Sequence, residues 1–170
     1  MPEAATLVSI DGRSVTIRPI RAADVVMETE FVRRLSPETR RYRFFGALND
    51  LSAAEAKRLC DVDGDQSMAF VASVQEKEGE VEIGVCRYAP ASKADVREMA
   101  ITVADEWQHT ELAKILLERL MTSAKQHGIR ELYTVELGDN RVMNDFARGF
   151  GMSAKRDPDD ATQVIYSMSI

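Results

Sequence analysis

The chain has 170 residues, of which 45% are hydrophobic and 29% are charged, with a formal net charge of -6. This composition is typical of a globular protein with one core, so we expect a single domain over residues 1–170. The acidic balance argues against nucleic acid as the main partner, and no apolar run approaches the ~18 residues needed to span a membrane.

The first part of the chain combines a β-hairpin with helices. Residues 6–10 and 15–20 are β-rich runs on either side of Asp11-Gly12, a dipeptide typical of tight hairpin turns. Helical spacing of apolar residues follows over 22–35. The basic stretch at 33–44 is interpreted as a solvated helix face.

Two more helices have clear start signals. Ser36 precedes Pro37, which is favoured at the first helical position, and we expect that helix to stop at Gly46. Ser52, with Glu55 three residues later, matches a capping box, so a third helix is expected to begin there.

The rest of the chain alternates strands and helices. The pattern predicts strands at 67–74, 81–89, 96–104, 131–137 and 162–170, and helices at 108–127 and 140–149. An antiparallel meander followed by a βαβ unit predicts an α/β (α+β) fold. Its sheet is expected to be mixed and mostly antiparallel, with six to seven strands and helices on both faces.

The cysteines and histidines do not indicate a metal site. Cys60 and Cys86 have no spacing typical of metal ligands or of a disulfide framework, so we expect reduced thiols in a cytoplasmic protein. His109 and His127 lie at opposite ends of one expected helix, so neither a metal site nor a histidine-based triad is expected.

Seven stretches in order along residues 15–152 resemble the GNAT superfamily of N-acetyltransferases, and most closely the acetyltransferase domain of bacterial protein lysine acetyltransferases. They are VTIRPIRAAD, RRLSPETRRYRFFG, LCDVDGDQSMAFVAS, IGVCRYA, REMAITVADEWQ, LLERLMTSAKQHGIREL and DNRVMNDFARGFGM. The resemblance implies acetyl-CoA as donor and an amine, in this branch a protein lysine, as acceptor. It also implies a homodimer, frequent among relatives, and a sheet splayed between its fourth and fifth main strands, 96–104 and 131–137, with pantetheine in the gap.

Glu98 is the candidate catalytic residue. An amine such as lysine, with a pKa near ~10.4, is mostly protonated at neutral pH, and only the free amine attacks a thioester. A nearby carboxylate can take that proton directly or through a water. The resemblance assigns this general-base role to the position of Glu98 in VREMA. The residues alone leave an alternative, a surface glutamate paired with Arg87 or Arg97.

The resemblance also implies cofactor contacts outside the phosphate loop. The backbone of Ile101, Thr102 and Val103 is expected to hydrogen-bond the pantetheine arm. Asn140 matches a family asparagine that contacts the cofactor or orients the cleft, and a helix N-cap is the alternative for this residue.

The expected pyrophosphate loop departs from the family pattern. Open N–H groups at a helix start favour an anion, and the family places Gln or Arg first, Gly fourth, and Gly or Ala sixth. Gln108 and Ala113 match, but Glu111 replaces the central glycine. The candidate cofactor residues here are Gln108, His109, Thr110, Glu111, Leu112, Ala113 and Lys114.

Glu111 sets a carboxylate against the expected phosphates. At roughly 4 to 6 Å and an effective dielectric near 20, each such contact costs a few kcal/mol, about a hundredfold in affinity. We therefore expect weakened CoA binding. Alternatively, Glu111 turns outward and complements the helix dipole, while a positive His109 partly replaces the missing basic residue.

Three functions are compatible with the sequence, and we favour the first. The first is an active N-acyltransferase that moves an acetyl group from acetyl-CoA to an amine, with a protein lysine as the suggested acceptor. The second is a degenerate, non-catalytic GNAT-fold domain that acts as a binding or regulatory module. A binder of a different, non-phosphorylated ligand in the same cleft is a third reading.

Overall fold

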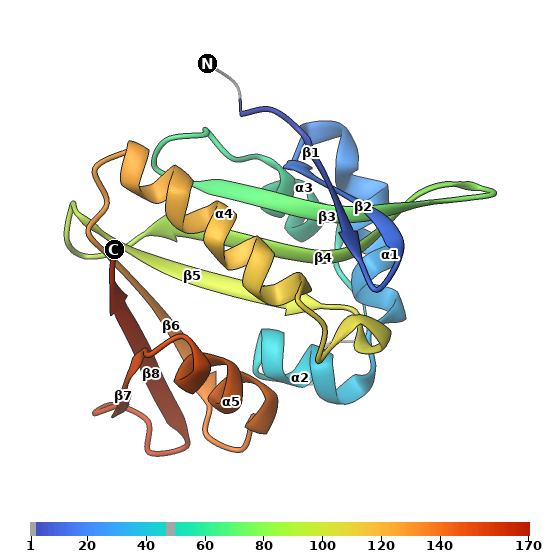
Figure 1. Ribbon diagram of the computed structural model, residues 1–170. Helices are drawn as coiled ribbons and strands as arrows, with labels where there is room; N and C mark the ends of the chain where they lie inside the picture. The colour runs from blue at the N-terminus through green and yellow to red at the C-terminus, as the bar shows by residue number, and fades with distance from the viewer. Residues whose placement is uncertain (1–2, 47–49) are drawn as a thin grey trace.

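The computed structural model describes residues 3–46 and 50–170 and contains one eight-stranded sheet (Figure 1). The spatial order of the strands is β1-β2-β3-β4-β5-β6-β8-β7. The strands are β1 Thr6–Ile10, β2 Arg13–Pro19, β3 Met68–Glu76, β4 Gly79–Pro90, β5 Val96–Val103, β6 Glu131–Leu137, β7 Ser153–Arg156 and β8 Gln163–Ser169. All neighbouring pairs are antiparallel except β5 and β6.

The predicted fold class is confirmed, but the count of six to seven strands is corrected to eight. The additional strand is β7, which pairs with β8 at the edge of the sheet. Its four residues, SAKR, are all exposed, and each of them is either small or cationic. Such a segment has no apolar alternation, so the pattern that predicts half-buried strands does not detect it.

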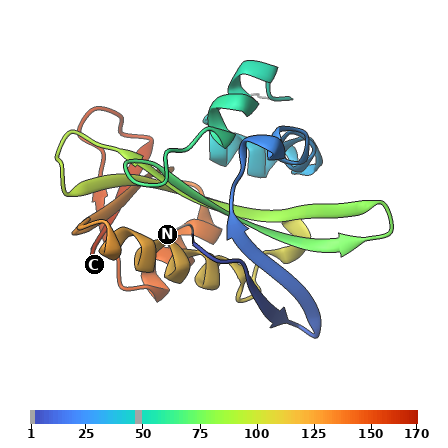
Figure 2. The same cartoon turned by 90° about the horizontal axis from the view of Figure 1, so that it is seen from above.

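Helices cover both faces of the sheet (Figures 1 and 2). They are α1 Val25–Arg34, α2 Pro37–Phe44, α3 Ala53–Cys60, α4 Leu112–Gln126 and α5 Arg141–Gly149. Figure 2 shows α1 to α3 on one side of the sheet and α4 on the other. The helices α1 and α4 both contact β4. None of the described helices is long and apolar enough to cross a membrane.

Local signals in the sequence explain most element boundaries. Asp11 and Gly12 have positive φ angles of 50° and 77°, as the tight hairpin turn requires. The hydroxyls of Ser36 and Ser52 cap α2 and α3, and the second forms the predicted capping box. The left-handed residue that ends α2 is Phe45, with φ 56°, and not the expected Gly46.

The strands β5 and β6 separate soon after they meet. They pair in parallel through three residues each, Val96↔Glu131, Arg97↔Leu132 and Glu98↔Tyr133. Beyond these pairs, β5 continues to Val103 and β6 to Leu137 without pairing to each other. The splayed sheet implied by the family resemblance is therefore present, and the gap opens at the level of Glu98.

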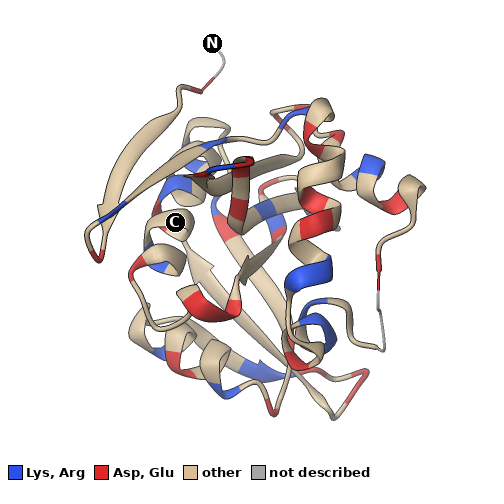
Figure 3. Ribbon diagram, turned by 90° about the vertical axis from the view of Figure 1, so that its right-hand side faces the viewer, with Lys and Arg blue, Asp and Glu red and all other residues tan. Residues whose placement is uncertain are grey.

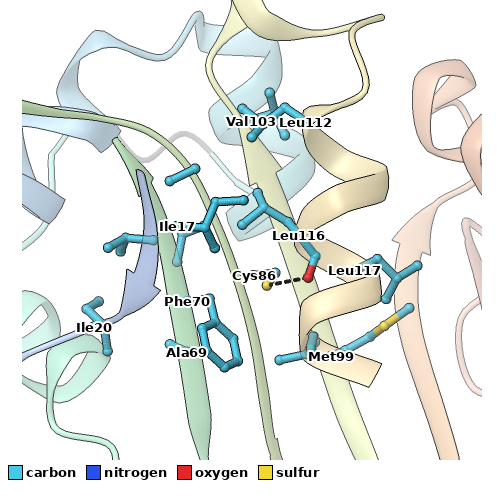
Figure 4. Close-up of a cluster of buried hydrophobic side chains, with 14 of the residues drawn as sticks. Ile17, Ile20, Ala69, Phe70, Cys86, Met99, Val103, Leu112, Leu116 and Leu117 are labelled. Carbon is cyan, nitrogen blue, oxygen red and sulfur yellow. Dashed lines mark hydrogen bonds between the residues drawn. The ribbon is translucent and has the colours of Figure 1, made fainter. Parts of the chain in front are cut away.

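The gap has two sides, which we call its banks: β5 with the strands before it in the sheet, and β6 with β8 and β7. The core between α4 and the sheet holds the first bank in place (Figure 4). Leu112, Leu116 and Leu117 are fully buried on α4, and the thiol of Cys86 donates to the Leu116 carbonyl at 3.2 Å. Close approach is possible because β4 has Gly84 beneath the helix. A Cβ atom on Gly84 would lie 3.1 Å from Leu116 Cδ1 and 3.3 Å from Leu112 Cδ2.

We expect Gly84→Ala to lower the free energy of unfolding by about 1–3 kcal/mol, because the added methyl overpacks the core and pushes α4 from the sheet. Chemical denaturation measures this change. The control is Gly149→Ala on α5, where a Cβ atom would meet no heavy atom within 4 Å. Equal effects of the two substitutions would contradict the tight packing of α4 on β4.

Candidate active site

A pocket of about 380 Å³ occupies the gap where β5 and β6 separate. Its walls come from β5, β6, α2, α5 and the segment that joins β5 to α4. Nine of the residues predicted from the sequence line this pocket: Glu98, Ile101, Thr102, Val103, Gln108, His109, Thr110, Ala113 and Asn140. The other three lie outside its lining: Glu111 and Lys114 are exposed, and Leu112 is fully buried in the core.

Glu98 lies at the closed end of the gap, in the last residue pair between β5 and β6. Its side chain is exposed and lines the pocket, and the Tyr133 hydroxyl donates to Oε2 at 3.5 Å. The alternative partners, Arg87 and Arg97, form hydrogen bonds to other groups. In residues 3–46 and 50–170, no salt bridge to Glu98 is present. The carboxylate is therefore free to meet a substrate.

The loop before α4 tolerates the loss of the family glycine. Glu111, in the central glycine position, has φ -74° and ψ -3°, an ordinary backbone for any residue. The left-handed residue is His109, with φ 63°, and it prevents the helix from starting at 108 as predicted. Thr110 Oγ1 donates to the Trp107 carbonyl at 2.7 Å and accepts from the Leu112 N–H at 3.2 Å. The loop is thus closed by a threonine hydroxyl instead of glycines.

The start of α4 keeps the backbone donors that an anion needs. Among the residues that the structure describes, five N–H groups there have no acceptor: those of His109, Thr110, Glu111, Ala113 and Lys114. Such groups, together with the helix dipole, favour a phosphate. The Glu111 side chain makes no cap hydrogen bond and is exposed outside the pocket lining. This arrangement agrees with the outward orientation that the sequence left open.

The helix α2 forms a wall of the pocket that the sequence did not indicate. Figure 1 shows α2 between α5 and the turn that leads into α4. Asp105 accepts from the Ser36 N–H at 2.9 Å, the Ser36 hydroxyl at 2.6 Å and the Thr39 hydroxyl at 2.8 Å. Thr39 Oγ1 in turn accepts from Gln108 Nε2 at 3.2 Å. The start of α2 is therefore tied to the segment that joins β5 to α4.

The other end of α2 is tied to the opposite bank. Arg41 Nη2 lies 2.6 Å from Asp139 Oδ2, and the Tyr42 hydroxyl donates to the Asp139 carbonyl at 3.2 Å. The basic stretch at 33–44 is therefore more than a solvated face, because it bridges β6–α5 as well. These partners are 97 and 98 residues apart in sequence, so no local pattern could have revealed them.

Asn140 is the N-cap of α5, which was one of the two roles that the sequence left open. Its Oδ1 accepts from the Met143 N–H at 3.1 Å, as expected for the N-cap of α5. It also lines the pocket. The contact with cofactor stays a prediction.

A second carboxyl group, Glu136, lines the pocket from β6 and was not among the predicted residues. Burial raises its pKa to about 7, although hydrogen bonding from Thr134 and the charge of Arg43 favour the ionised form. Burial also lowers the pKa of Arg43 to about 10. In the sequence, Glu136 is one glutamate at the end of a short strand, and nothing in ELYTVEL distinguishes it from a solvent-facing residue.

The splayed parallel pair, the pocket within it and the open helix start form one site, with unpaired strand edges for an extended ligand and free N–H groups for an anion. The Acetyltransferase (GNAT) family model matches residues 30–152, and the chain belongs to this family. Acetyltransferase PA5475 of Pseudomonas aeruginosa is 43% identical over 161 residues, which cover 94% of this chain and 86% of the relative.

Solved structures agree with this assignment. The GNAT domain of S. lividans PAT has a TM-score of 0.89 and 27% identity, covering 98% of this chain and 97% of that domain. A phosphinothricin acetyltransferase from Sinorhizobium meliloti in complex with AcCoA shares the fold, with a TM-score of 0.70, 19% identity, and coverage of 92% and 88%. The chain is an N-acetyltransferase that uses acetyl-CoA, so the reading as a non-catalytic module is not favoured.

We expect Glu111→Gln to tighten acetyl-CoA binding about 2- to 10-fold at low salt, since an exposed charge near the helix start is screened by solvent. Isothermal titration calorimetry at two ionic strengths measures this, and the gain should shrink at the higher one. Glu78→Gln, an exposed change in the turn between β3 and β4, is the control and should have little effect. A hundredfold gain would mean instead that the Glu111 carboxylate reaches the pyrophosphate.

We expect Asp105→Asn to lower the free energy of unfolding by about 1–2 kcal/mol at pH 7, because the charge-assisted bonds to Ser36 and Thr39 weaken. Desolvation opposes ionisation, but these hydrogen bonds hold the pKa of Asp105 below its usual range. The stabilisation by this carboxylate is therefore complete at pH values above the pKa that Asp105 has in the unfolded chain. It is lost as the pH falls through the lower pKa that Asp105 has in the folded protein.

Urea titrations of wild type and Asp105→Asn at pH 7 and at about pH 3 check this dependence. The difference between the two proteins should shrink at the lower pH. Glu106→Gln, an exposed neighbour in the same turn, controls for the loss of charge alone. A difference that does not change with pH would show that the carboxylate is not the stabilising species.

Proposed function

We propose that this N-acetyltransferase moves the acetyl group of acetyl-CoA to a lysine side chain of a protein, with Glu98 as the general base. The single observation that carries the proposal is the position of Glu98, a carboxylate without an ion-pair partner among the described residues, at the closed end of the splayed pocket. S. lividans PAT is a protein acetyltransferase, and the similarity to its GNAT domain over nearly the full length of both chains supports a protein acceptor.

The donor is proposed to lie along the gap. Its pyrophosphate binds the open N–H groups of His109, Thr110 and the first turn of α4. Its pantetheine arm follows β5 from Val103 to Ile101, where one edge of the strand pairs with β4 and the other has no pairing to β6. The acetyl group then points toward Glu98, at the end of the pocket where the strands meet.

The chain's own residues supply the proton chemistry. Glu98 takes a proton from the lysine ammonium directly or through a water, which leaves a free amine. The amine nitrogen attacks the thioester carbonyl carbon, a C–N bond forms, and the C–S bond breaks. The helix α2, tied to both banks, is positioned to shape the entrance for the acceptor.

The other finer assignments are proposals as well. One continuous sheet carries both banks of the pocket, which supports a single domain over residues 1–170. Both cysteines are buried, and burial raises the pKa of each thiol to about 12, which suits reduced thiols in the cytoplasm. The homodimer stays a prediction from the family resemblance.

We expect Glu98→Gln to reduce kcat for a lysine peptide about 10²- to 10⁴-fold, while the Kd for acetyl-CoA changes little. The assay follows CoA release, with mass spectrometry of the acetylated peptide. The control is Glu131→Gln, which changes the first residue of β6, outside the pocket lining. Unchanged kcat would remove Glu98 as the base, and transfer to small amines but to no lysine peptide would remove the protein acceptor.

A further inference from the structure

Glu136 lies across the gap from the strand that is proposed to hold the donor. The last pair between the two strands is Glu98↔Tyr133. Counting three residues further along each strand brings Ile101 on β5 to the level of Glu136 on β6. Both residues line the same pocket. The carboxyl group of Glu136 is thus placed between the closed end of the pocket and its phosphate-binding end.

The surroundings of Glu136 keep its carboxyl group partly protonated. Thr134 Oγ1 donates to Glu136 Oε1 at 2.7 Å. The charge of Arg43 from α2 acts on Glu136, and Tyr166 from β8 lies within its electrostatic reach. Glu98 from β5 and Asp145 from α5 line the same pocket. Burial raises the pKa of Glu136 to about 7 against the opposing effects of Thr134, Arg43 and Asn140. A substantial fraction of molecules therefore carries this proton at neutral pH.

The position of the donor determines which atom is near this proton. The attacking amine lies between Glu98 and the acetyl group, and the thioester sulfur, bonded to the acetyl carbon, lies on the side of that carbon that faces the pyrophosphate. This order brings the sulfur toward the level of Ile101. Among the residues of β6 that line the pocket, Thr134, Val135 and Glu136, only Glu136 is ionisable. Thiols have a pKa near ~8.5, so a carboxyl group that titrates close to neutral pH is the stronger acid and can protonate a departing thiolate.

We propose that Glu136 is a second catalytic residue, the general acid that protonates the CoA sulfur as the thioester breaks. This rests on the proposed function. When the C–S bond breaks, its electron pair moves to sulfur, and the Glu136 proton forms the S–H bond of the leaving CoA.

The proton balance closes over one turnover. The acceptor nitrogen loses two protons, one to Glu98 before attack and one to solvent as the amide forms. Glu98 releases its proton to solvent, and the Glu136 carboxylate takes one back from solvent. The net result is one amide, one CoA thiol and one proton released for each lysine ammonium consumed, with no change of oxidation state.

The first test is the pH dependence of kcat with saturating acetyl-CoA and a lysine peptide. Because the acid form of Glu136 is required, kcat of the wild type should fall as pH rises through its pKa, with a midpoint at or above about 7. In Glu136→Gln, kcat should drop about 10²-fold or more and this alkaline decline should vanish. The Kd for acetyl-CoA should stay within a few-fold of the wild type, which separates lost proton transfer from misfolding.

Two further variants sharpen the comparison. Glu136→Asp keeps a carboxyl group and should retain part of kcat together with an alkaline decline. Glu131→Gln changes a glutamate of the same strand outside the pocket lining and should behave as wild type. Equal kcat and equal pH profiles for wild type and Glu136→Gln would overturn the inference and leave the proposed function intact.

A carbon-13 NMR titration of the glutamate carboxyl groups tests the inference without any acceptor. The resonance that disappears in Glu136→Gln should titrate near pH 7 in the wild type. If it titrates near ~4.3, as an ordinary glutamate does, Glu136 is no acid at working pH and the inference is wrong whichever amine the enzyme uses. Absence of transfer to any lysine peptide would instead overturn the proposed acceptor.

Discussion

The strands β5 and β6 pair through only three residues each, and the backbone groups beyond Glu98 and Tyr133 face a gap. Backbone N–H and C=O groups need partners when they leave water. This gap is therefore suited to an extended ligand that carries amide groups along its length, such as pantetheine. The gap persists because its banks are held separately. The first is packed against α4 over Gly84, and the second belongs to the β6–β8–β7 part of the sheet.

Polar contacts join the helix α2 to both of these banks, while Phe44 at its end packs against the hydrophobic core. Asp105 and Gln108 hold its start, and Asp139 holds its end. Such charge-assisted bonds are directional, so the helix has a defined place across the pocket without filling it with apolar side chains. The same contacts connect the wall proposed for the acceptor to the loop proposed for the phosphates.

Three carboxyl groups of the pocket have different surroundings and hence different chemistry. Asp105 is held in its ionised form by hydrogen bonds from Ser36 and Thr39. Burial keeps Glu136 partly protonated, whereas Glu98 is exposed at the closed end. Charges and protons are thus distributed by the environment that the fold provides to each group, and not by residue type. The same reasoning explains why Glu111 is tolerated: its carboxylate lies in solvent.

The sequence by itself determined what depends on near neighbours. The Asp11-Gly12 turn, the caps Ser36 and Ser52, and the strand Glu131–Leu137 follow from local backbone preferences and periodicity. The resemblance of the motifs to the acetyltransferase family implied that Glu98 and the start of α4 share one pocket. Only the tertiary structure decided the rest: the edge strand β7, the outward Glu111, the wall formed by α2, and the burial of Glu136. The contacts of α2 join residues nearly a hundred positions apart, and β7 has an exposed, polar sequence that carries no apolar alternation. Desolvation and hydrogen bonding at such places are set by the folded surroundings and leave no trace in local spacing.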